Sequence, residues 1–180
     1  MERHYLCIDL KSFFASCECV ERGIDGFKVP LVVANPTQGN GAITLAITPF
    51  LKAQGIKSRT RLYEIPPHIK YQIVKPRMSL YIAYSKKVIS VYLEYVSESD
   101  LLPYSIDECF LDVTDYLKLY NKNDTELADD ILKRVYEKTG LTANCGIGSN
   151  MLLAKVAMDT DAKKYKNGIS KWTMEDVQNK

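Results

Sequence analysis

The sequence predicts an α+β fold in which an antiparallel sheet carries helices on one face and a small lobe is inserted between its elements. Short apolar runs typical of strands alternate with segments whose apolar residues recur every three or four positions, as in helices. Residues 23–78 interrupt this alternation and become basic and rich in proline toward their end. Without residues 23–78, the remaining strands and helices, together with one strand taken from that segment, follow the order of a split βαβ-βαβ arrangement.

The first part of the chain alternates strands and helices. Strands are expected at residues 4–10, 30–35 and 41–47, and helices at residues 12–22 and 48–55. The hydroxyl of Thr48 is expected to cap the second of these helices, with Pro49 at its first position and Gly55 at its end.

The second part begins with a long helix, expected over residues 79–96 because apolar side chains recur there at helical spacing. It is followed by a strand pair around Asp107 and Glu108, a helix at 124–138, a strand at 141–148 and a helix that opens at Ser149. The last residues, from Thr173 onward, are typical of a helix start.

The composition is that of a globular protein, with 180 residues, 46% hydrophobic and 26% charged residues and a formal net charge of +2. No apolar run approaches the roughly 20 residues that cross a bilayer, and the N-terminal segment lacks a signal-peptide pattern. We therefore expect a cytoplasmic protein with no membrane partner. The five cysteines are odd in number and lie mostly in apolar segments, which indicates buried, reduced thiols.

Two adjacent acids, Asp107 and Glu108, stand between two apolar runs. In the predicted sheet, the strand at residues 4–10 lies next to this pair and brings Asp9 beside it. Three carboxylates at one sheet edge repel one another and lose hydration unless a cation fills the space. Mg²⁺ prefers such oxygen ligands, and two Mg²⁺ ions assist displacement at phosphorus. The alternative is a solvated strand turn with Asp9 as a helix cap.

Three blocks, CIDLKSFFASCE, YSIDECFLDVT and GIGSNMLLAKVA, resemble the catalytic core of a Y-family DNA polymerase of the UmuC-like branch, which acts in UV-damage repair. The blocks span nearly the whole chain in the family's order. The resemblance implies a translesion DNA polymerase that uses two Mg²⁺ ions to transfer a nucleotide from dNTP to a primer 3′-hydroxyl. Primer-template DNA and dNTP are the implied partners, together with a sliding clamp bound through a C-terminal part of the family that this chain lacks.

The resemblance also divides the chain into family domains. It implies a ferredoxin-like palm at residues 1–22 and 79–170, and fingers at residues 23–78. Residues 171–180 would begin a thumb that is otherwise missing. The chain is therefore expected to be a truncated catalytic fragment, weakly active or inactive alone.

Catalytic roles follow from the resemblance residue by residue. Asp9, Asp107 and Glu108 match the catalytic, metal-binding acids, and the backbone carbonyl of Leu10 matches a further metal ligand. Phe14 matches the steric gate, an aromatic ring under the sugar that would clash with a 2′-hydroxyl. The alternative for Phe14 is a core position, a role that suits the neighbouring Phe13 better, because adjacent helical residues do not share a face.

Nucleotide contacts are implied as well. The amides of Ser12 and Phe13, free at a helix N-terminus, suit phosphate oxygens. Lys163 matches the lysine that contacts the triphosphate, with Lys164 as the alternative. From the inserted lobe, Lys52 offers charge and Thr48 a hydroxyl, where relatives in another branch use a different set.

Two further residues match the family pattern, and each has an ordinary alternative. Asn150 either belongs to the site or caps its helix, and Lys155 either belongs to the site or is a solvated surface residue. Two other functions remain open at this point: a nucleotide cyclase, which leaves Phe14 and the lysines without a purpose, and a non-catalytic nucleotide- or protein-binding module that keeps the fold.

Overall fold

The computed structural model describes residues 2–179. The chain divides into two compact units: Met1–Leu10 with Ser85–Lys180, which we call the five-stranded unit, and Lys11–Tyr84, the three-stranded unit. Residues 1 and 180, the outer limits of the predicted palm and thumb segments, lie outside the described range. The assignment of palm and fingers remains a prediction. The chain passes from one observed unit to the other after Leu10 and after Tyr84, whereas the predicted domain boundaries follow residues 22 and 78.

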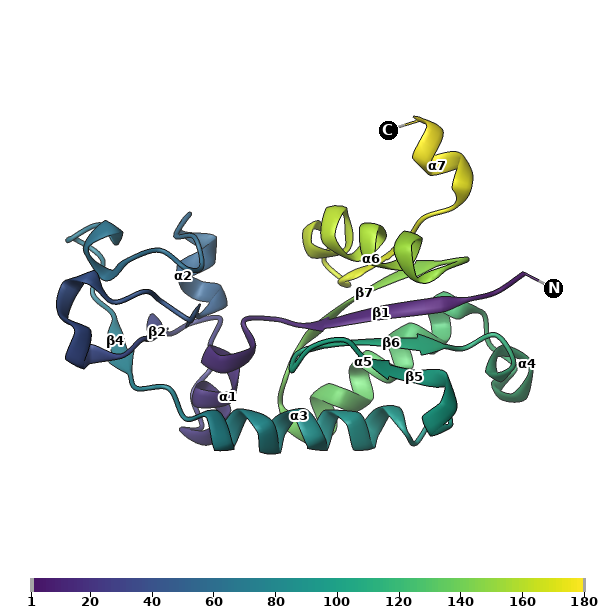
Figure 1. Cartoon of the computed structure of the whole chain (residues 1–180), viewed down its shortest axis with the longest axis horizontal. Coiled ribbons are helices and arrows are strands. Elements are labelled where there is room, and N and C mark those ends of the chain that lie inside the picture. Colours follow the sequence, from purple (N-terminus) through teal and green to yellow (C-terminus); the bar gives the residue numbers. More distant parts are fainter. Residues whose placement is uncertain (1, 180) are drawn as a thin grey trace. The chain divides into compact units, whose positions relative to one another are not determined.

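The five-stranded unit is built on a sheet whose central strand is β1 (Figure 1). The strands are β1 (Tyr5–Leu10), β5 (Leu101–Pro103), β6 (Glu108–Asp112), β7 (Ala143–Gly148) and β8 (Ile169–Lys171), in the order β5-β6-β1-β7-β8. β1 runs antiparallel to both β6 and β7, whereas β8 runs parallel to β7. Leu6, Cys7 and Ile8 are fully buried, because β1 is covered on both faces.

Helices cover both faces of this sheet. α5 (Asp124–Thr139) and the part of α3 (Met78–Tyr92) that follows Tyr84 lie on one face, and α6 (Met151–Thr160) lies on the other (Figure 1). The remaining helical elements of this unit are α4 (Tyr116–Tyr120), α7 (Met174–Asn179) and the 3₁₀ turns η3 (Glu98–Asp100) and η4 (Ala162–Lys164). Within residues 2–179, no helix is long and apolar enough to span a membrane.

Local sequence signals explain where α5 begins and ends. The Asn123 side chain accepts a hydrogen bond from the Glu126 amide at 2.9 Å, and the Glu126 carboxylate accepts one from the Asn123 amide at 2.9 Å, which completes a capping box. Gly140 ends the helix with a positive φ of 73°, a conformation that glycine adopts without strain.

The three-stranded unit has its own sheet and core. Its strands are β2 (Leu31–Val33), β3 (Ala46–Ile47) and β4 (Gln72–Val74) in the order β3-β2-β4, and its helical elements are α1 (Phe13–Glu21), α2 (Pro49–Ala53), η1 (Pro36–Gly41) and η2 (Leu62–Glu64). Val32, Ile47 and Leu51 are fully buried in its core, so α2 is held by burial of its apolar face against the sheet.

The α+β class, the strand at residues 4–10 and the pairing of the acidic strand with it are confirmed. The prediction that a strand of the lobe joins the main sheet is wrong, because the lobe strands form a separate sheet and β8 supplies the fifth strand instead. At three residues, β8 is too short to show a strand period. Helices are expected on one face of the sheet only, but α6 covers the other face. It connects the parallel strands β7 and β8, and a connection of this kind packs back on the sheet.

Two details of the lobe also differ from expectation. The strand expected at residues 41–47 is reduced to Ala46–Ile47. Thr48 makes no side-chain cap, because its hydroxyl accepts the Leu31 amide at 3.2 Å instead. Pro49 does begin α2, as predicted, and Gly55 follows its end with a φ of 84°.

Close packing of α6 on β7 depends on glycine. A Cβ atom at Gly146 would overlap the backbone oxygen of Ala154 and the backbone nitrogen of Met158, and neither backbone atom can rotate away. We predict that Gly146→Ala lowers the free energy of unfolding by about 3 kcal/mol, because the helix must move off the sheet. Chemical denaturation measures this change.

The matched control is Gly41→Ala, since a Cβ at Gly41 has no atom within 4 Å among the described residues and the site is exposed. It should change stability by no more than about 0.5 kcal/mol. Equal effects of the two substitutions would contradict the packing argument.

Candidate active site

The β1–β6 pairing brings two of the predicted acids together. Asp9 is the direct antiparallel partner of Glu108, and the Leu10 amide donates to the backbone oxygen of Asp107 at 2.9 Å. Opposed residues of an antiparallel pair point to the same face of the sheet. Cys7, two residues before Asp9, packs against α6, so the Asp9 and Glu108 side chains lie on the face that α6 covers.

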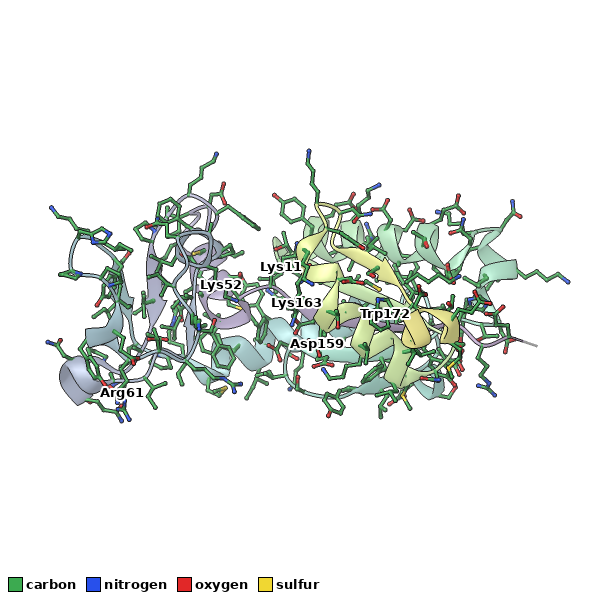
Figure 2. All side chains as sticks on the ribbon, turned by 90° about the horizontal axis from the view of Figure 1, so that it is seen from above. Lys11, Lys52, Arg61, Asp159, Lys163 and Trp172 are labelled. Atoms are coloured by element: carbon green, nitrogen blue, oxygen red, sulfur yellow. The ribbon has the colours of Figure 1, made fainter. Side chains whose placement is uncertain are left out.

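Lysines from α6 and η4 neutralise this acidic pair. Lys155 Nζ lies 2.6 Å from Glu108 Oε1, and Lys163 Nζ lies 3.6 Å from Asp9 Oδ2. Asp159 pairs with both lysines, at 3.2 Å from Lys155 and 2.8 Å from Lys163. Asp159 and Lys163 are labelled in Figure 2. The result is an alternating chain of charges along one edge of α6.

The electrostatics of Asp9 show that its charge is unfavourable in the fold. Burial raises the pKa of Asp9 to about 6, the charge of Lys163 opposes this shift, and the carboxylates of Asp107 and Glu108 add to it. Lys163 keeps its charge, because its partners Asp159 and Asp9 raise its pKa against the effect of burial. An acid with a raised pKa beside a cation in a partly buried site is typical of functional groups.

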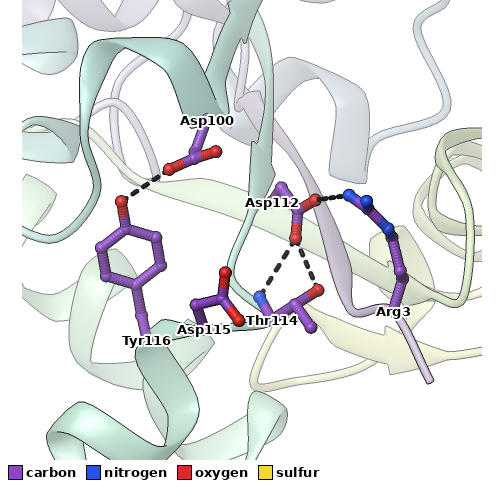
Figure 3. Close-up of a pocket in the computed structure, with 6 residues that line it drawn as sticks. All are labelled: Arg3, Asp100, Asp112, Thr114, Asp115 and Tyr116. Carbon is purple, nitrogen blue, oxygen red and sulfur yellow. Dashed lines mark hydrogen bonds and ion pairs between the residues drawn. The ribbon is translucent and has the colours of Figure 1, made fainter. Parts of the chain in front are cut away.

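Acids at the other end of β6 provide a contrast. A polar cavity of about 420 Å³ lies there, lined by Arg3, Asp100, Asp112, Thr114, Asp115 and Tyr116 (Figure 3). Asp112 accepts hydrogen bonds from Arg3 at 2.7 Å and from the Thr114 amide at 3.1 Å. Burial would raise the pKa of Asp112, but these hydrogen bonds outweigh it and the pKa is lowered. Asp112 is therefore a satisfied structural acid, unlike Asp9.

The donor chemistry of the Asp9 site fits a hard divalent cation. It offers three carboxylates and the Leu10 carbonyl, all oxygen ligands. Asn144, the partner of Asp9 on β7, has a buried Oδ1 without a hydrogen-bond partner in the described part of the chain. Within residues 2–179, no three His, Cys, Asp or Glu side chains are arranged around one metal position. In this structure the candidate carboxylates Asp9 and Glu108 pair with lysines, and Asp107 accepts a hydrogen bond from the Ser105 hydroxyl at 2.8 Å.

The other predicted site residues belong to the three-stranded unit. α1 begins at Phe13, after Ser12 in a left-handed conformation with φ 48° and ψ 45°, so the first amides of α1 have no intrahelical acceptor. Phe13 is buried in the core, as expected, whereas Phe14 is only partly buried. The side chain of Lys52 is exposed on α2.

Thr48 lies in a different environment from the one its predicted role needs. The residue is fully buried, and its hydroxyl is already used by the Leu31 amide. The Thr48 hydroxyl is therefore not exposed for contact with a nucleotide.

The structure decides between the alternatives for Asn150 and Lys155. Asn150 Oδ1 accepts the Leu153 amide at 2.9 Å, so Asn150 is the cap of α6. Lys155 pairs with Glu108 and lies 5.5 Å from the Tyr104 ring centre, so it belongs to the acidic site. The sequence analysis missed Asp159, although its spacing of four residues from both Lys155 on α6 and Lys163 in η4 is a recognisable signal.

The raised pKa of Asp9 yields a prediction about stability. The folded protein holds the Asp9 proton up to about pH 6, against an ordinary pKa of 3.8, so ionisation of Asp9 weakens the fold as the pH rises through 6. Asp9→Asn should raise the free energy of unfolding by about 1–3 kcal/mol at pH 8, and this gain should vanish below about pH 4. Denaturation in a chelating buffer across this pH range measures it.

The control is Asp129→Asn, because Asp129 is an exposed acid that pairs with Lys133 on α5. It should leave stability nearly unchanged at each pH. A loss of stability in Asp9→Asn that is the same at pH 4 and pH 8 would show that Asp9 is a structural acid.

Comparisons with known proteins agree with this geometry. Residues 8–159 match the model of the impB/mucB/samB family. UvrX of Bacillus subtilis (strain 168), a protein named for UV-damage repair, is 39% identical over 179 residues, which cover 99% of this chain and 42% of UvrX. DNA polymerase IV 2 of the same organism is 36% identical over 179 residues, with 98% and 42% covered.

A solved structure, that of DinB from Sulfolobus solfataricus, superposes with a TM-score of 0.80 at 26% identity, covering 98% of this chain and 50% of DinB. The chain thus spans about two fifths of the length of these two curated relatives.

Proposed function

Because the chain belongs to the impB/mucB/samB family of Y-family DNA polymerases, we propose that it forms the palm and fingers part of a translesion DNA polymerase. The observation that carries this proposal is the pairing of Asp9 with Glu108, next to Asp107, inside the region that matches the family. The reaction is transfer of a nucleotide from dNTP to the 3′-hydroxyl of a primer on template DNA.

In this proposal Asp9, Asp107 and Glu108, with the Leu10 carbonyl, hold two Mg²⁺ ions. When bound, the ions stabilise the attacking and leaving oxygens of the displacement at phosphorus. The protein supplies the acids at a fixed spacing, since Asp9 and Glu108 are locked by strand register. The raised pKa of Asp9 favours the proposal, because a divalent cation would stabilise the ionised carboxylate, which burial and the neighbouring charges of Asp107 and Glu108 disfavour.

The triphosphate is proposed to contact cationic side chains and backbone amides. Lys163 is held near the acids by Asp159 and supplies positive charge. The free amides of Ser12 and Phe13 suit phosphate oxygens, and Lys52 adds charge from the fingers. Phe14 is the proposed steric gate.

Primer-template DNA is the proposed macromolecular partner. The exposed basic residues Lys57, Arg59 and Arg61 in the three-stranded unit suit phosphate contacts that weaken with salt. Binding to a sliding clamp stays a prediction of the family resemblance, and a cytoplasmic location stays a prediction of the sequence pattern. Membership of the family counts against the nucleotide cyclase, while a non-catalytic module is an outcome of the next experiment.

We predict that Asp107→Ala abolishes primer extension by the full-length protein without loss of stability. The variant removes one proposed metal ligand and also one of the charges that repel Asp9. Primer extension in Mg²⁺ and thermal unfolding are measured side by side, with Asp129→Ala on α5 as the acid-removal control that keeps activity. Near-normal extension by a well-folded Asp107→Ala protein would leave the chain as a non-catalytic module.

A second prediction concerns Phe14. If its ring excludes the 2′-hydroxyl, Phe14→Ala should raise incorporation of ribonucleotides relative to deoxynucleotides by about tenfold or more. The measurement is kcat/KM for both sugars, with the melting temperature of each variant.

Phe13→Ala is the matched control, because Phe13 is a buried neighbour of the same size. It should lose about 3–5 kcal/mol of stability and keep the sugar preference. The reverse pattern, in which Phe14→Ala loses stability and keeps its sugar preference, would assign Phe14 to the core.

A further inference from the structure

The ring of Phe14 does not stand alone at the surface of α1. It stacks on the ring of Tyr81 in α3, with the ring centres 4.3 Å apart and the planes inclined by 13°. Phe14 is partly exposed, whereas Tyr81 is fully buried. An exposed aromatic side chain on a helix has several rotamers available, and a parallel stack on a fixed ring favours one of them.

Tyr81 is itself fixed by a buried charge. Its hydroxyl donates to Glu18 Oε1 at 2.7 Å, and Glu18 is fully buried. Arg77 binds both oxygens of the same carboxylate, with Nε 3.1 Å from Oε1 and Nη2 2.6 Å from Oε2, and Arg22 pairs with Oε2 as well. Such a two-pronged contact defines the orientation of the carboxylate as well as its charge.

Glu18 stays ionised in this setting. Burial would raise its pKa, but the hydrogen bonds from Arg77, Arg22 and Tyr81 outweigh burial and lower it. A buried acid of this kind is weak evidence for a contribution to stability, because its desolvation offsets most of the attraction. Its effect on geometry is clearer, since it fixes the Tyr81 hydroxyl and hence the direction of the ring axis, while complete burial of Tyr81 restricts rotation of the ring about that axis.

The spacing along the two helical segments explains the arrangement. Phe14 and Glu18 are four residues apart in α1, so they share one face of that helix. Arg77 directly precedes α3, and its backbone oxygen accepts the amide of Tyr81, four residues on, so these two residues lie on the same side of α3. All these residues lie within Lys11–Tyr84, so the contacts are internal to the three-stranded unit.

We propose that Tyr81 is a positioning residue for sugar discrimination, which holds the Phe14 ring in the orientation that excludes a 2′-hydroxyl, with Glu18 and Arg77 as its anchor. This inference rests on the proposed function, in which Phe14 is the steric gate. Tyr81 acts through Phe14 and needs no contact with the nucleotide.

A double-mutant cycle tests the inference in primer extension by the full-length protein. The variants are Phe14→Ala, Tyr81→Leu and the double variant, and the readout is the ratio of kcat/KM for dNTP to that for rNTP. Tyr81→Leu should lower this ratio about threefold to tenfold, the range that the strength of one aromatic stack allows, mainly by lowering KM for rNTP. The double variant should match Phe14→Ala alone, because without the Phe14 ring Tyr81 has nothing to orient.

Two variants and a control separate positioning from general damage. Tyr81→Met fills the same core without a ring face and should resemble Tyr81→Leu, which keeps the test open if the leucine variant does not fold. Tyr81→Phe keeps the ring and should retain the ratio to within about twofold of the native protein. The control is Tyr84→Leu, since Tyr84 is a buried tyrosine of the same helix whose hydroxyl donates to Glu21 at 2.7 Å. Tyr84→Leu should lose stability and keep the ratio.

Two results would overturn the inference. One is an unchanged ratio in the folded Tyr81→Leu or Tyr81→Met protein, including an equal loss for both sugars as in general damage, and the other is a double variant whose effects add. If Phe14→Ala relaxes the ratio and the Tyr81 variants do not, only the positioning role of Tyr81 fails. If Phe14→Ala itself leaves the ratio unchanged, the gate assignment under the proposed function fails, and the role of Tyr81 fails with it.

Discussion

The antiparallel pairing of β1 with β6 on one side and β7 on the other is the constraint on which the candidate site depends. It places Glu108 and Asn144 directly beside Asp9. Because side chains alternate between the faces of a strand, a slip of one residue would turn Asp9 to the opposite face, away from α6. Complete burial of Leu6 and Ile8 on that opposite face prevents the slip, so the core of the sheet also sets the geometry of the acids.

The same face of the sheet carries like charges at close range. Strand register holds Asp9 and Glu108 side by side, and Lys155 of α6 and Lys163 of η4 form ion pairs with them. α6 reaches the sheet only because β7 has glycine under it. Burial raises the pKa of Asp9, the charge of Lys163 opposes this shift only in part, and the charges of Asp107 and Glu108 add to it. Partly buried charges at positions where a hydrophobic pair would be more stable are expected at a functional site.

In the three-stranded unit, the partly exposed ring of Phe14 stacks on the ring of Tyr81. The Tyr81 hydroxyl binds the buried carboxylate of Glu18, which also pairs with the guanidinium groups of Arg77 and Arg22. A buried ionic cluster adds little to stability compared with apolar packing, but it is directional, and the packing of apolar side chains is much less so. The start of α1 therefore combines backbone amides that have no intrahelical acceptor with the side chain of Phe14, which stacks on the buried ring of Tyr81.

The sequence by itself determined most of the strands and helices, though not β4, β8 or α4. It also determined the acids at the ends of β1 and β6, the buried Phe13 and the three blocks that resemble the family. These features depend on local period and on residues close together in the chain, and that information is present in a single sequence. Tertiary structure alone decided that β8 completes the sheet, that α6 takes the second face, that the Thr48 hydroxyl binds Leu31, and that Tyr81 lies under Phe14. Each of these is a contact between segments that the chain brings together only by folding, so no local pattern records it.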